Sequence, residues 1–330
     1  MIWIKLVLCC LIILLAGTKL ARYGDAISER TGLGRMWIGL ILIGLVTSMP
    51  EMVTGVSSAV FVGQPDLALG NFWGSCIFNL SILAVLDIFY KKEPVLTSAS
   101  TRYILPAFLG ILLIFVAALS IVIGDVVTGI SLGWFGLTSI IIFTLYILGI
   151  RQMFLYNKKH PEPVVDEESQ YTELSNLKIY GTFAIAALGI IGGGIWLSFI
   201  GDEIAVTYNL NASFVGSLFL AIGTSLPEIV VAITALRMGA IDLAVGDILG
   251  ANMLNTANIF ITDIFYSGGP LLSDVSSRNL FTALAMILMT LIVIMGLKFK
   301  NKRKTFGIIS WHALLILCIY IATSFILFNY

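Results

Sequence analysis

The stretch Thr47-Ser48-Met49-Pro50-Glu51 places an acid beside a helix-breaking proline within a long apolar run, and Thr224-Ser225-Leu226-Pro227-Glu228 repeats this arrangement 177 residues later. Proline cannot donate a backbone hydrogen bond and it crowds the preceding turn, so each run should form a broken helix. A carboxylate inside a membrane is costly and marks a functional site by default. Because the two acids recur at equivalent positions, we predict that Glu51 and Glu228 belong to one ion-binding site.

The composition indicates an all-α integral membrane protein. Of the 330 residues, 58% are hydrophobic and only 12% are charged, and the mean hydropathy is +1.00. Such a chain is too apolar for a water-soluble globular protein. We expect the first apolar run to be retained rather than cleaved, because Lys19 and Arg22 follow it without an evident cleavage site. Runs long enough to cross about 30 Å of hydrocarbon predict ten transmembrane helices, at residues 3–20, 35–62, 66–90, 102–124, 127–154, 178–199, 212–237, 241–266, 279–297 and 306–328.

The distribution of basic residues predicts the orientation in the membrane. If ten spans alternate in direction, the loops after the first, third, fifth, seventh and ninth carry 17 of the 19 lysines and arginines. Only Lys5 and Arg278 fall on the other side. By the positive-inside rule those five loops are cytoplasmic. We therefore expect a multi-pass protein of the plasma membrane with both termini extracellular.

An internal repeat divides the chain into two halves. Gly24-Asp25 and Gly201-Asp202 share the offset of 177, and residues 66–90 resemble residues 242–266 at an offset of 176. Because each half has an odd number of spans, the second half enters the membrane from the opposite side, giving an inverted-topology repeat. Such repeats bind substrate near the midplane, where broken helices meet. We predict an N-terminal repeat, a cytoplasmic linker and a C-terminal repeat, with the bounds 1–156, 157–177 and 178–330.

The residues around each break are rich in oxygen. Pro50 leaves the carbonyl of Val46 without its helical partner, and Pro227 does the same to Gly223. In a membrane such carbonyls are tolerated only where they face protein, water or a cation. Hydroxyls and carboxylates accompany them, at Thr47, Ser48, Glu51, Thr224, Ser225 and Glu228. Hard cations such as calcium and sodium prefer an all-oxygen environment of this kind.

The helix that follows each break supplies a second polar face. Asn71, Ser75 and Asn79 are spaced four residues apart, so they share one face of a helix. The equivalent residues of the second half are Asp247, Ala251 and Asn255. Hydrogen bonding between helices is the alternative to ion binding for this stripe. Close packing of helices is predicted at the nearby glycines, Gly70, Gly74, Gly246 and Gly250.

These paired motifs resemble the alpha repeats of the calcium/cation antiporter superfamily, and in particular those of prokaryotic sodium/calcium exchangers. The resemblance rests on the motif GTSLPE at residues 223–228 and on its first copy. It also rests on a downstream pattern that follows each copy, in which glycines precede a serine or alanine and then an asparagine. It covers nearly the whole chain and implies exchange of sodium for calcium by alternating access. The cation-binding positions that it implies are Gly44, Thr47, Ser48, Glu51, Ser75 and Asn79 in the first half and Ala221, Thr224, Ser225, Glu228, Ala251 and Asn255 in the second. Metal ligation is expected from Glu51, Glu228, Asn79, Asn255, Thr47 and Thr224.

Three positions depart from the pattern of that family. Ala251 lacks a hydroxyl that is common there, and Asn255 stands where sodium/calcium exchangers carry an aspartate. Asp247 stands at the position that Asn71 occupies in the first repeat. It either restores the missing charge or caps the start of its helix. Proton-coupled calcium exchange is therefore the alternative to sodium coupling. A cation channel is disfavoured, because an inverted repeat is typical of alternating access.

Other functions find little support in the sequence. No nucleophile–base pair, metal-ligand cluster or phosphate-binding loop appears, so we expect neither an enzyme nor a cofactor. The expected partners are the lipid bilayer and the transported calcium and sodium ions, without nucleic acid or an obligatory protein partner. Asp87 and Asp263 occupy equivalent positions near span ends and are expected to be structural, with Asp87 pairing with Lys91 four residues later.

Overall fold

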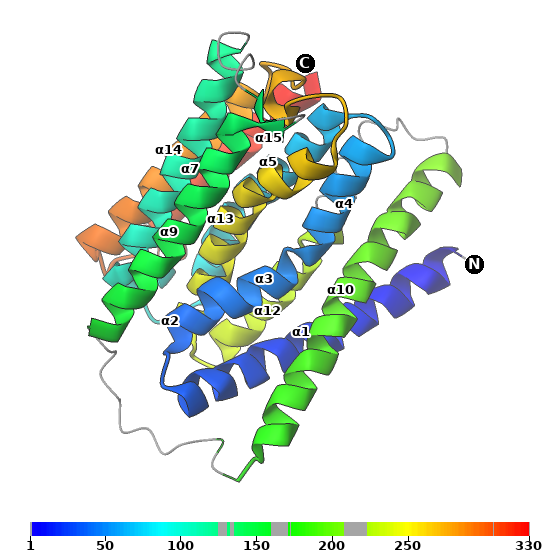
Figure 1. The fold of residues 1–330 in the computed structure, drawn as a ribbon. Helices are drawn as coiled ribbons and strands as arrows, with labels where there is room; N and C mark the ends of the chain where they lie inside the picture. The colour runs from blue at the N-terminus through cyan, green and yellow to red at the C-terminus, as the bar shows by residue number, and fades with distance from the viewer. Residues whose placement is uncertain are drawn as a thin grey trace.

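The computed structural model describes residues 2–124, 131–132, 135–159, 171, 173–207, 223–305 and 307–329, and within them the chain is almost entirely helical (Figure 1). The elements before the linker are α1 (Ile2–Thr31), α2 (Arg35–Trp37), η1 (Ile38–Ile43), α3 (Gly44–Thr47), α4 (Met49–Val60), α5 (Pro65–Phe89), α6 (Val95–Ser98), η2 (Thr101–Tyr103), α7 (Ile104–Ile123), the two-residue strands β1 (Ser131–Leu132) and β2 (Phe135–Gly136), and α9 (Leu137–Lys159). The elements after it are α10 (Asn176–Thr207), α12 (Leu226–Arg237), α13 (Ile241–Phe265), η3 (Leu271–Ser273), α14 (Asn279–Phe299) and α15 (Trp311–Asn329).

Among the described residues, six helices are long and apolar enough to cross a membrane. They are α1, α5, η2 with α7, α9, the Asn176–Gly201 part of α10, and α14. A seventh span results if the bent pair Arg35–Thr47 and Met49–Val60 is counted as one. The bend of 41° falls at Ser48, two residues before Pro50, so the predicted break in the first half is present.

The remaining predicted spans do not meet this criterion of length and apolar composition within the described residues. α13 is 25 residues long but carries Asp242, Asp247 and Asp263, while the apolar part of α15, Trp311–Leu327, is shorter. α12 has 12 residues, and most of the predicted span before it lies outside the described residues. The count of ten transmembrane helices therefore stays a prediction.

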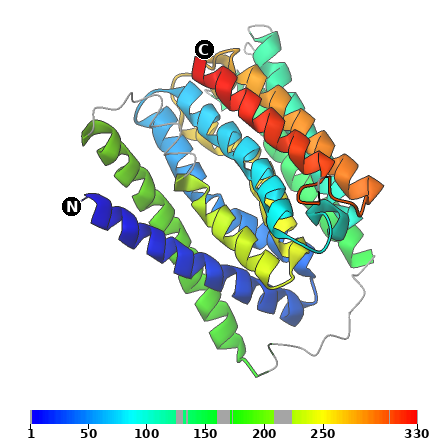
Figure 2. The same ribbon diagram turned by 180° about the vertical axis from the view of Figure 1, so that it is seen from behind.

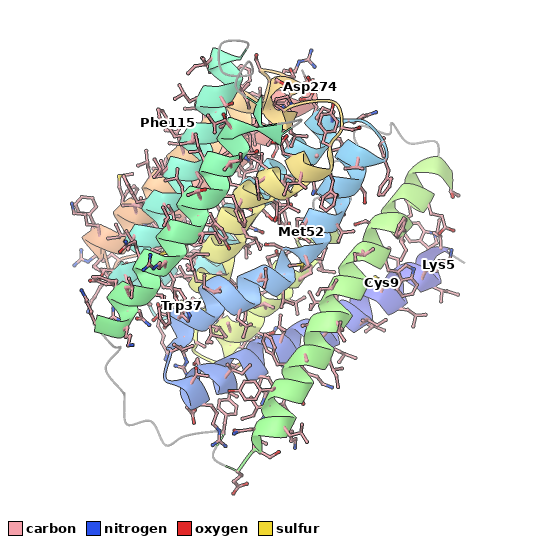
Figure 3. All side chains as sticks on the ribbon, in the orientation of Figure 1. Lys5, Cys9, Trp37, Met52, Phe115 and Asp274 are labelled. Carbon is pink, nitrogen blue, oxygen red and sulfur yellow. The ribbon has the colours of Figure 1, made fainter. Side chains whose placement is uncertain are left out.

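The helices form two flanks around a buried middle. α1 and α10 lie side by side along one flank in both views, and α7, α9 and α14 form the other (Figures 1 and 2). Between them lie the bent α3–α4 pair, α5, α12 and α13, and the large side chains Phe72 and Trp73 of α5 are fully buried. The outer faces are also apolar: Phe115 is 53% exposed and points away from the bundle (Figure 3). An outward apolar surface suits contact with lipid.

The backbone of η1, a turn of π-helix, lies directly against α13. A Cβ added at Gly250 would lie 1.9 Å from the carbonyl oxygen of Leu40, and one at Gly246 would lie 3.0 Å from the Leu40 nitrogen. Only glycine allows so close an approach, which confirms the predicted close packing at these two positions. For Gly70 and Gly74 no described atom lies within 4 Å of an added Cβ, and the residues equivalent to η1 in the second half lie outside the described part of the chain.

Two equivalent aspartates fix the loop at the end of each central helix. Asp87 accepts a hydrogen bond from the Val95 amide at 2.8 Å, and Asp263, 176 residues later, accepts one from the Leu271 amide at 2.7 Å. The second oxygen of Asp87 accepts from the Ser310 amide at 2.7 Å. Both residues are 1% exposed, so their structural role is evident.

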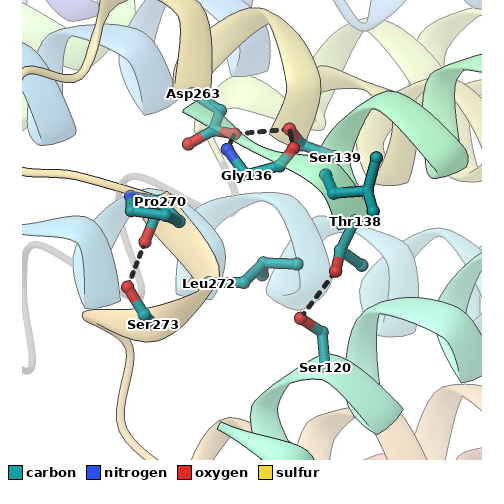
Figure 4. A pocket seen from close by; sticks show the side chains of 9 residues that line it. Ser120, Gly136, Thr138, Ser139, Asp263, Pro270, Leu272 and Ser273 are labelled. Carbon is teal, nitrogen blue, oxygen red and sulfur yellow. Dashed lines mark hydrogen bonds between the residues drawn. The ribbon is translucent and has the colours of Figure 1, made fainter. Parts of the chain in front are cut away.

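The second oxygen of Asp263 is bound in the same way. It accepts from the Gly136 amide at 2.8 Å and from the hydroxyl of Ser139 (Figure 4). The predicted ion pair between Asp87 and Lys91 is wrong. Backbone amides occupy the Asp87 carboxylate instead, and the ion pairs among the described residues are Lys5–Glu203 and Arg35–Asp25.

The same offset links further hydrogen bonds, each of which joins the two parts of the chain. Asp66 accepts from the Ser276 amide at 2.7 Å, and its equivalent Asp242 accepts from the Ser100 amide at 2.8 Å. At the centre, α5 and α13 touch through Cys76 and Asn252, which are themselves equivalent positions. Asn252 Nδ2 donates to the Cys76 carbonyl at 3.1 Å, and Cys76 Sγ donates to the Asn252 carbonyl at 3.6 Å.

The end of α1 is tied to both the next helix and the linker. Asp25, 3% exposed, accepts from Arg35 Nε at 2.6 Å and from the Tyr171 hydroxyl at 3.2 Å. Arg30 donates to the carbonyls of Tyr171 and Leu174. The buried aspartate of the Gly-Asp motif in the first half is thus neutralised by an arginine, as a buried charge requires.

Candidate cation-binding site

Glu51 lies in the first turn of α4, immediately after the break at Ser48. Its side chain is completely buried. Ser225, which stands just before α12 in the other part of the chain, donates its hydroxyl to Glu51 Oε1 at 3.3 Å. Asn71 of α5 donates Nδ2 to the Glu51 carbonyl at 2.9 Å. The broken helix, the second polar helix and the opposite half therefore meet at this glutamate.

Glu228 occupies the equivalent place in α12. Pro227 is the second residue of that helix and Glu228 the third, so the turn at Ser225 corresponds to the break at Ser48. Thr224, Ser225 and Glu228 are all 0% exposed. Neither carboxylate oxygen of Glu228 has a hydrogen-bond partner among the described residues. Since Ser225, three residues earlier, binds Glu51, the two glutamates border one buried cluster of oxygen atoms.

Asp247 belongs to the same cluster. It is the seventh residue of α13 and 0% exposed, and its Oδ1 accepts the Thr47 hydroxyl at 2.9 Å. An acid that deep within a helix does not cap its first turn. Capping, one of the two roles considered from the sequence, is thus wrong. The hydrogen bond instead joins Asp247 to the broken helix of the first half.

The central helices contribute amides and a hydroxyl. Ser75 and Asn79 of α5 and Asn255 of α13 are 0% exposed. A Cβ added at Gly44 would lie 2.9 Å from the nitrogen of Ala251, so these two predicted positions are in backbone contact. The remaining predicted position, Ala221, lies outside the described residues.

Many of these oxygen atoms have no hydrogen-bond partner within the described part of the protein. They are Ser48 Oγ, Glu51 Oε2, Ser75 Oγ, Asn79 Oδ1, Glu228 Oε1 and Oε2, Asp247 Oδ2 and Asn255 Oδ1. A buried polar atom without a partner costs about 1–3 kcal/mol, and more if it is charged. Oxygen ligands held in this way fit a hard cation, which would satisfy several of them at once.

The ligand set is mixed rather than a dense group of acids. Among the described residues, no group of three or more His, Cys, Asp or Glu side chains is placed to hold a metal ion. Carboxylates, hydroxyls and amide oxygens together would have to provide the coordination, as calcium and sodium accept but zinc does not favour.

Sequence reasoning missed two asparagines of α13. Asn252 donates and accepts hydrogen bonds across to α5. Asn258 is 0% exposed and neither of its amide atoms has a partner among the described residues. Asn258 follows Asn255 by three residues, a spacing that puts both on one helical face, so the sequence contained this signal.

Comparison with known proteins gives a consistent result. A family model described as sodium/calcium exchanger protein matches residues 1–151 and 178–329. The uncharacterized membrane protein MJ0091 of Methanocaldococcus jannaschii is 24% identical over 300 residues, covering 90% of this chain and 88% of the relative. The putative antiporter CaxA of Alkalimonas amylolytica is 24% identical over 283 residues, covering 82% and 83%.

The fold also matches a solved structure. A structure of the sodium-calcium exchanger NCX_Mj superposes with a TM-score of 0.74, covers 98% of both chains and is 21% identical in sequence. At that identity the match establishes the fold alone.

Proposed function

Because this chain belongs to the sodium/calcium exchanger family, we propose that it is an antiporter that exchanges calcium for sodium by alternating access. One observation carries the proposal: the two buried glutamates follow the break at Ser48 and the equivalent turn at Ser225, and Ser225 binds Glu51 at 3.3 Å. Carboxylates from both parts of the chain thereby border one cluster of oxygen ligands.

Charge balance explains why such a site would exchange ions rather than leak them. Glu51 and Glu228 supply two negative charges, which attract a calcium ion. Buried carboxylates without a counter-charge cost several kcal/mol each, so the protein resists changing conformation with the site empty. Sodium ions would replace calcium by using the carboxylates together with hydroxyls such as Thr47 and Ser75. Each change of access then requires a bound cation, which couples the two fluxes.

Asp247 enlarges the ligand set by a third carboxylate. Its Oδ1 is held by the Thr47 hydroxyl, and its Oδ2 has no partner among the described residues. The Thr47 hydroxyl donates its proton to Asp247 and so presents its lone pairs to a cation. We propose that Asp247 supplies the additional negative charge that Asn255, being neutral, does not.

The proposed architecture is ten spans in two inverted repeats, 1–156 and 178–330, joined by a cytoplasmic linker. The hydrogen bonds of Asp66 and Asp242 support it, because each crosses to the other half at equivalent positions. The Cys76–Asn252 pair would then lie on the pseudo-twofold axis, where equivalent residues meet. α9 ends at the lower left of the molecule in Figure 1, while Asp274 lies near the top in the same orientation (Figure 3). The two loops would face opposite sides of the membrane.

Proton coupling is the competing mechanism. Three buried carboxylates could carry protons, and Ala251 offers no hydroxyl to a sodium ion. The hydroxyls of Thr47, Ser48, Ser75, Thr224 and Ser225, all 0% exposed, favour sodium instead. A purely proton-coupled site would need only the carboxylates.

Calcium uptake into proteoliposomes tests the proposal. Purified protein is reconstituted, the membrane potential is clamped with potassium and valinomycin, and radioactive calcium uptake is followed with either an outward sodium gradient or a pH gradient. We expect uptake with sodium and little uptake with the pH gradient alone. Uptake driven fully by protons without sodium would replace sodium coupling by proton coupling, and uptake without any counter-ion would indicate a channel.

A further inference from the structure

We propose that Asn252 is a positioning residue that turns the side-chain oxygen of Asn79 toward the transported cation. The inference rests on the proposed function, because it concerns the same oxygen cluster. Asn252 is no cation ligand in this view: it acts on the site through Asn79.

A chain of hydrogen bonds fixes the orientation of both amides. The carbonyl oxygen of Cys76 can only accept, so the side-chain atom of Asn252 that lies 3.1 Å from it must be the nitrogen. Asn252 Oδ1 then faces Asn79, at 3.2 Å, and can only accept in turn. Asn79 must therefore present its nitrogen to Asn252. Its oxygen is left on the opposite side.

The geometry lets one side chain contact both partners. Cys76 and Asn79 are three residues apart on α5 and share a face of that helix, and the Asn252 amide reaches from α13 into the space between them. Asn79 is 0% exposed, and its Oδ1 has no partner among the described residues. A cation ligand must be an oxygen, since an amide nitrogen carries hydrogens and no lone pair to offer. Holding Asn79 with its oxygen free is therefore a direct contribution to cation binding.

The second half has no equivalent side-chain hydrogen bond to its asparagine among the described residues. The residue equivalent to Asn252 is Cys76, whose thiol donates to the Asn252 carbonyl. Neither amide atom of Asn255 has a partner within the described residues. The two asparagines at equivalent positions are thus unlike: Asn79 is held by a hydrogen bond to the Asn252 side chain, and the side chain of Asn255 has no such bond within the described residues.

Equilibrium binding of radioactive calcium to the purified full-length protein tests this inference. Asn252→Leu removes both hydrogen bonds at similar volume and should weaken calcium binding about tenfold, as loss of an outer-shell partner does. Ser81→Ala is the matched control, because Ser81 lies on α5 half a turn beyond Asn79 and binds only its own helix, at the Phe78 carbonyl. It should bind calcium as the native protein does. Asn252→Leu should also melt at a lower temperature without calcium, because it leaves the buried amide nitrogen of Asn79 without its acceptor.

A second background separates positioning from a general loss of structure. In the variant Asn79→Asp both terminal atoms of the side chain are oxygen, so either orientation of residue 79 presents an oxygen to the cation. Adding Asn252→Leu to this variant should therefore change its calcium affinity less than about twofold. Two results would overturn the inference: a tenfold loss of calcium affinity when Asn252→Leu is added to Asn79→Asp, or native calcium affinity in the single variant Asn252→Leu. Absence of calcium binding by the native protein is a separate result and would overturn the proposed function. If Asn252→Leu does not fold, Asn252→Ala takes its place with the same outcomes.

Discussion

At the scale of single residues, the carboxylates of Glu51 and Glu228 should be indispensable for transport and dispensable for folding. Glutamine keeps the volume of the side chain and removes its charge, so Glu51→Gln or Glu228→Gln should lower calcium uptake at least about 100-fold. Without cations the melting temperature should equal or exceed that of the native protein, because a buried charge without a partner is removed. Glu203→Gln is the control: Glu203 is 44% exposed, paired with Lys5, and should transport normally. Near-native uptake by either buried variant would exclude that glutamate from the site.

Asp247 can be tested in the same way. Asp247→Asn keeps an acceptor for the Thr47 hydroxyl and removes one negative charge. If Asp247 contributes charge to the site, calcium should bind about tenfold more weakly, which corresponds to about 1.4 kcal/mol, with an unchanged melting temperature. Unchanged calcium affinity together with a lowered melting temperature would give Asp247 a structural role only.

At the scale of secondary-structure elements, the contact between η1 and α13 limits what the helices can tolerate. Gly250→Ala would bring a methyl group to 1.9 Å from a backbone carbonyl, so the helices must separate. We expect a loss of about 3 kcal/mol, seen as a lower melting temperature and weaker calcium binding. The control is Gly110→Ala on α7, where the added carbon would meet Met253 at an ordinary 3.8 Å. That variant should be as stable as the native protein or slightly more stable, since alanine favours helix. Equal stability of the two variants would contradict the close packing.

The elements also explain how far the sequence could predict the site. The break in the first half and the placing of both acids directly after a proline were predictable, because proline chemistry and helical spacing are local properties. The role of Asp247 was not, since whether an acid caps a helix or faces a neighbour depends on where that helix begins, and α13 begins at Ile241. Asn252 was missed because its importance lies in partners on α5, which no local pattern reveals. The expected pair of Asp87 with Lys91 failed because backbone amides compete better for a buried carboxylate.

At the scale of the whole molecule, the proposed topology predicts which loops are accessible from each side. In a background without the four native cysteines, single cysteines at positions 158 and 302 should react only from the cytoplasmic side. Cysteines at positions 64 and 274 should react only from outside. All four positions are exposed, so a membrane-impermeant maleimide can reach them. Labelling of residue 158 from outside would contradict both the orientation and the cytoplasmic linker.

The contact between Cys76 and Asn252 has a consequence for how such a protein could arise. In an ancestral dimer of two identical five-helix chains, any residue on the symmetry axis would meet its own copy, and a cysteine could face only a cysteine. Duplication and fusion into one gene remove that restriction, because each copy then mutates alone. The asparagine that meets a cysteine here is a pairing that a homodimer could not encode. Once the copies are joined, the two sides of one ion pathway can acquire different affinities.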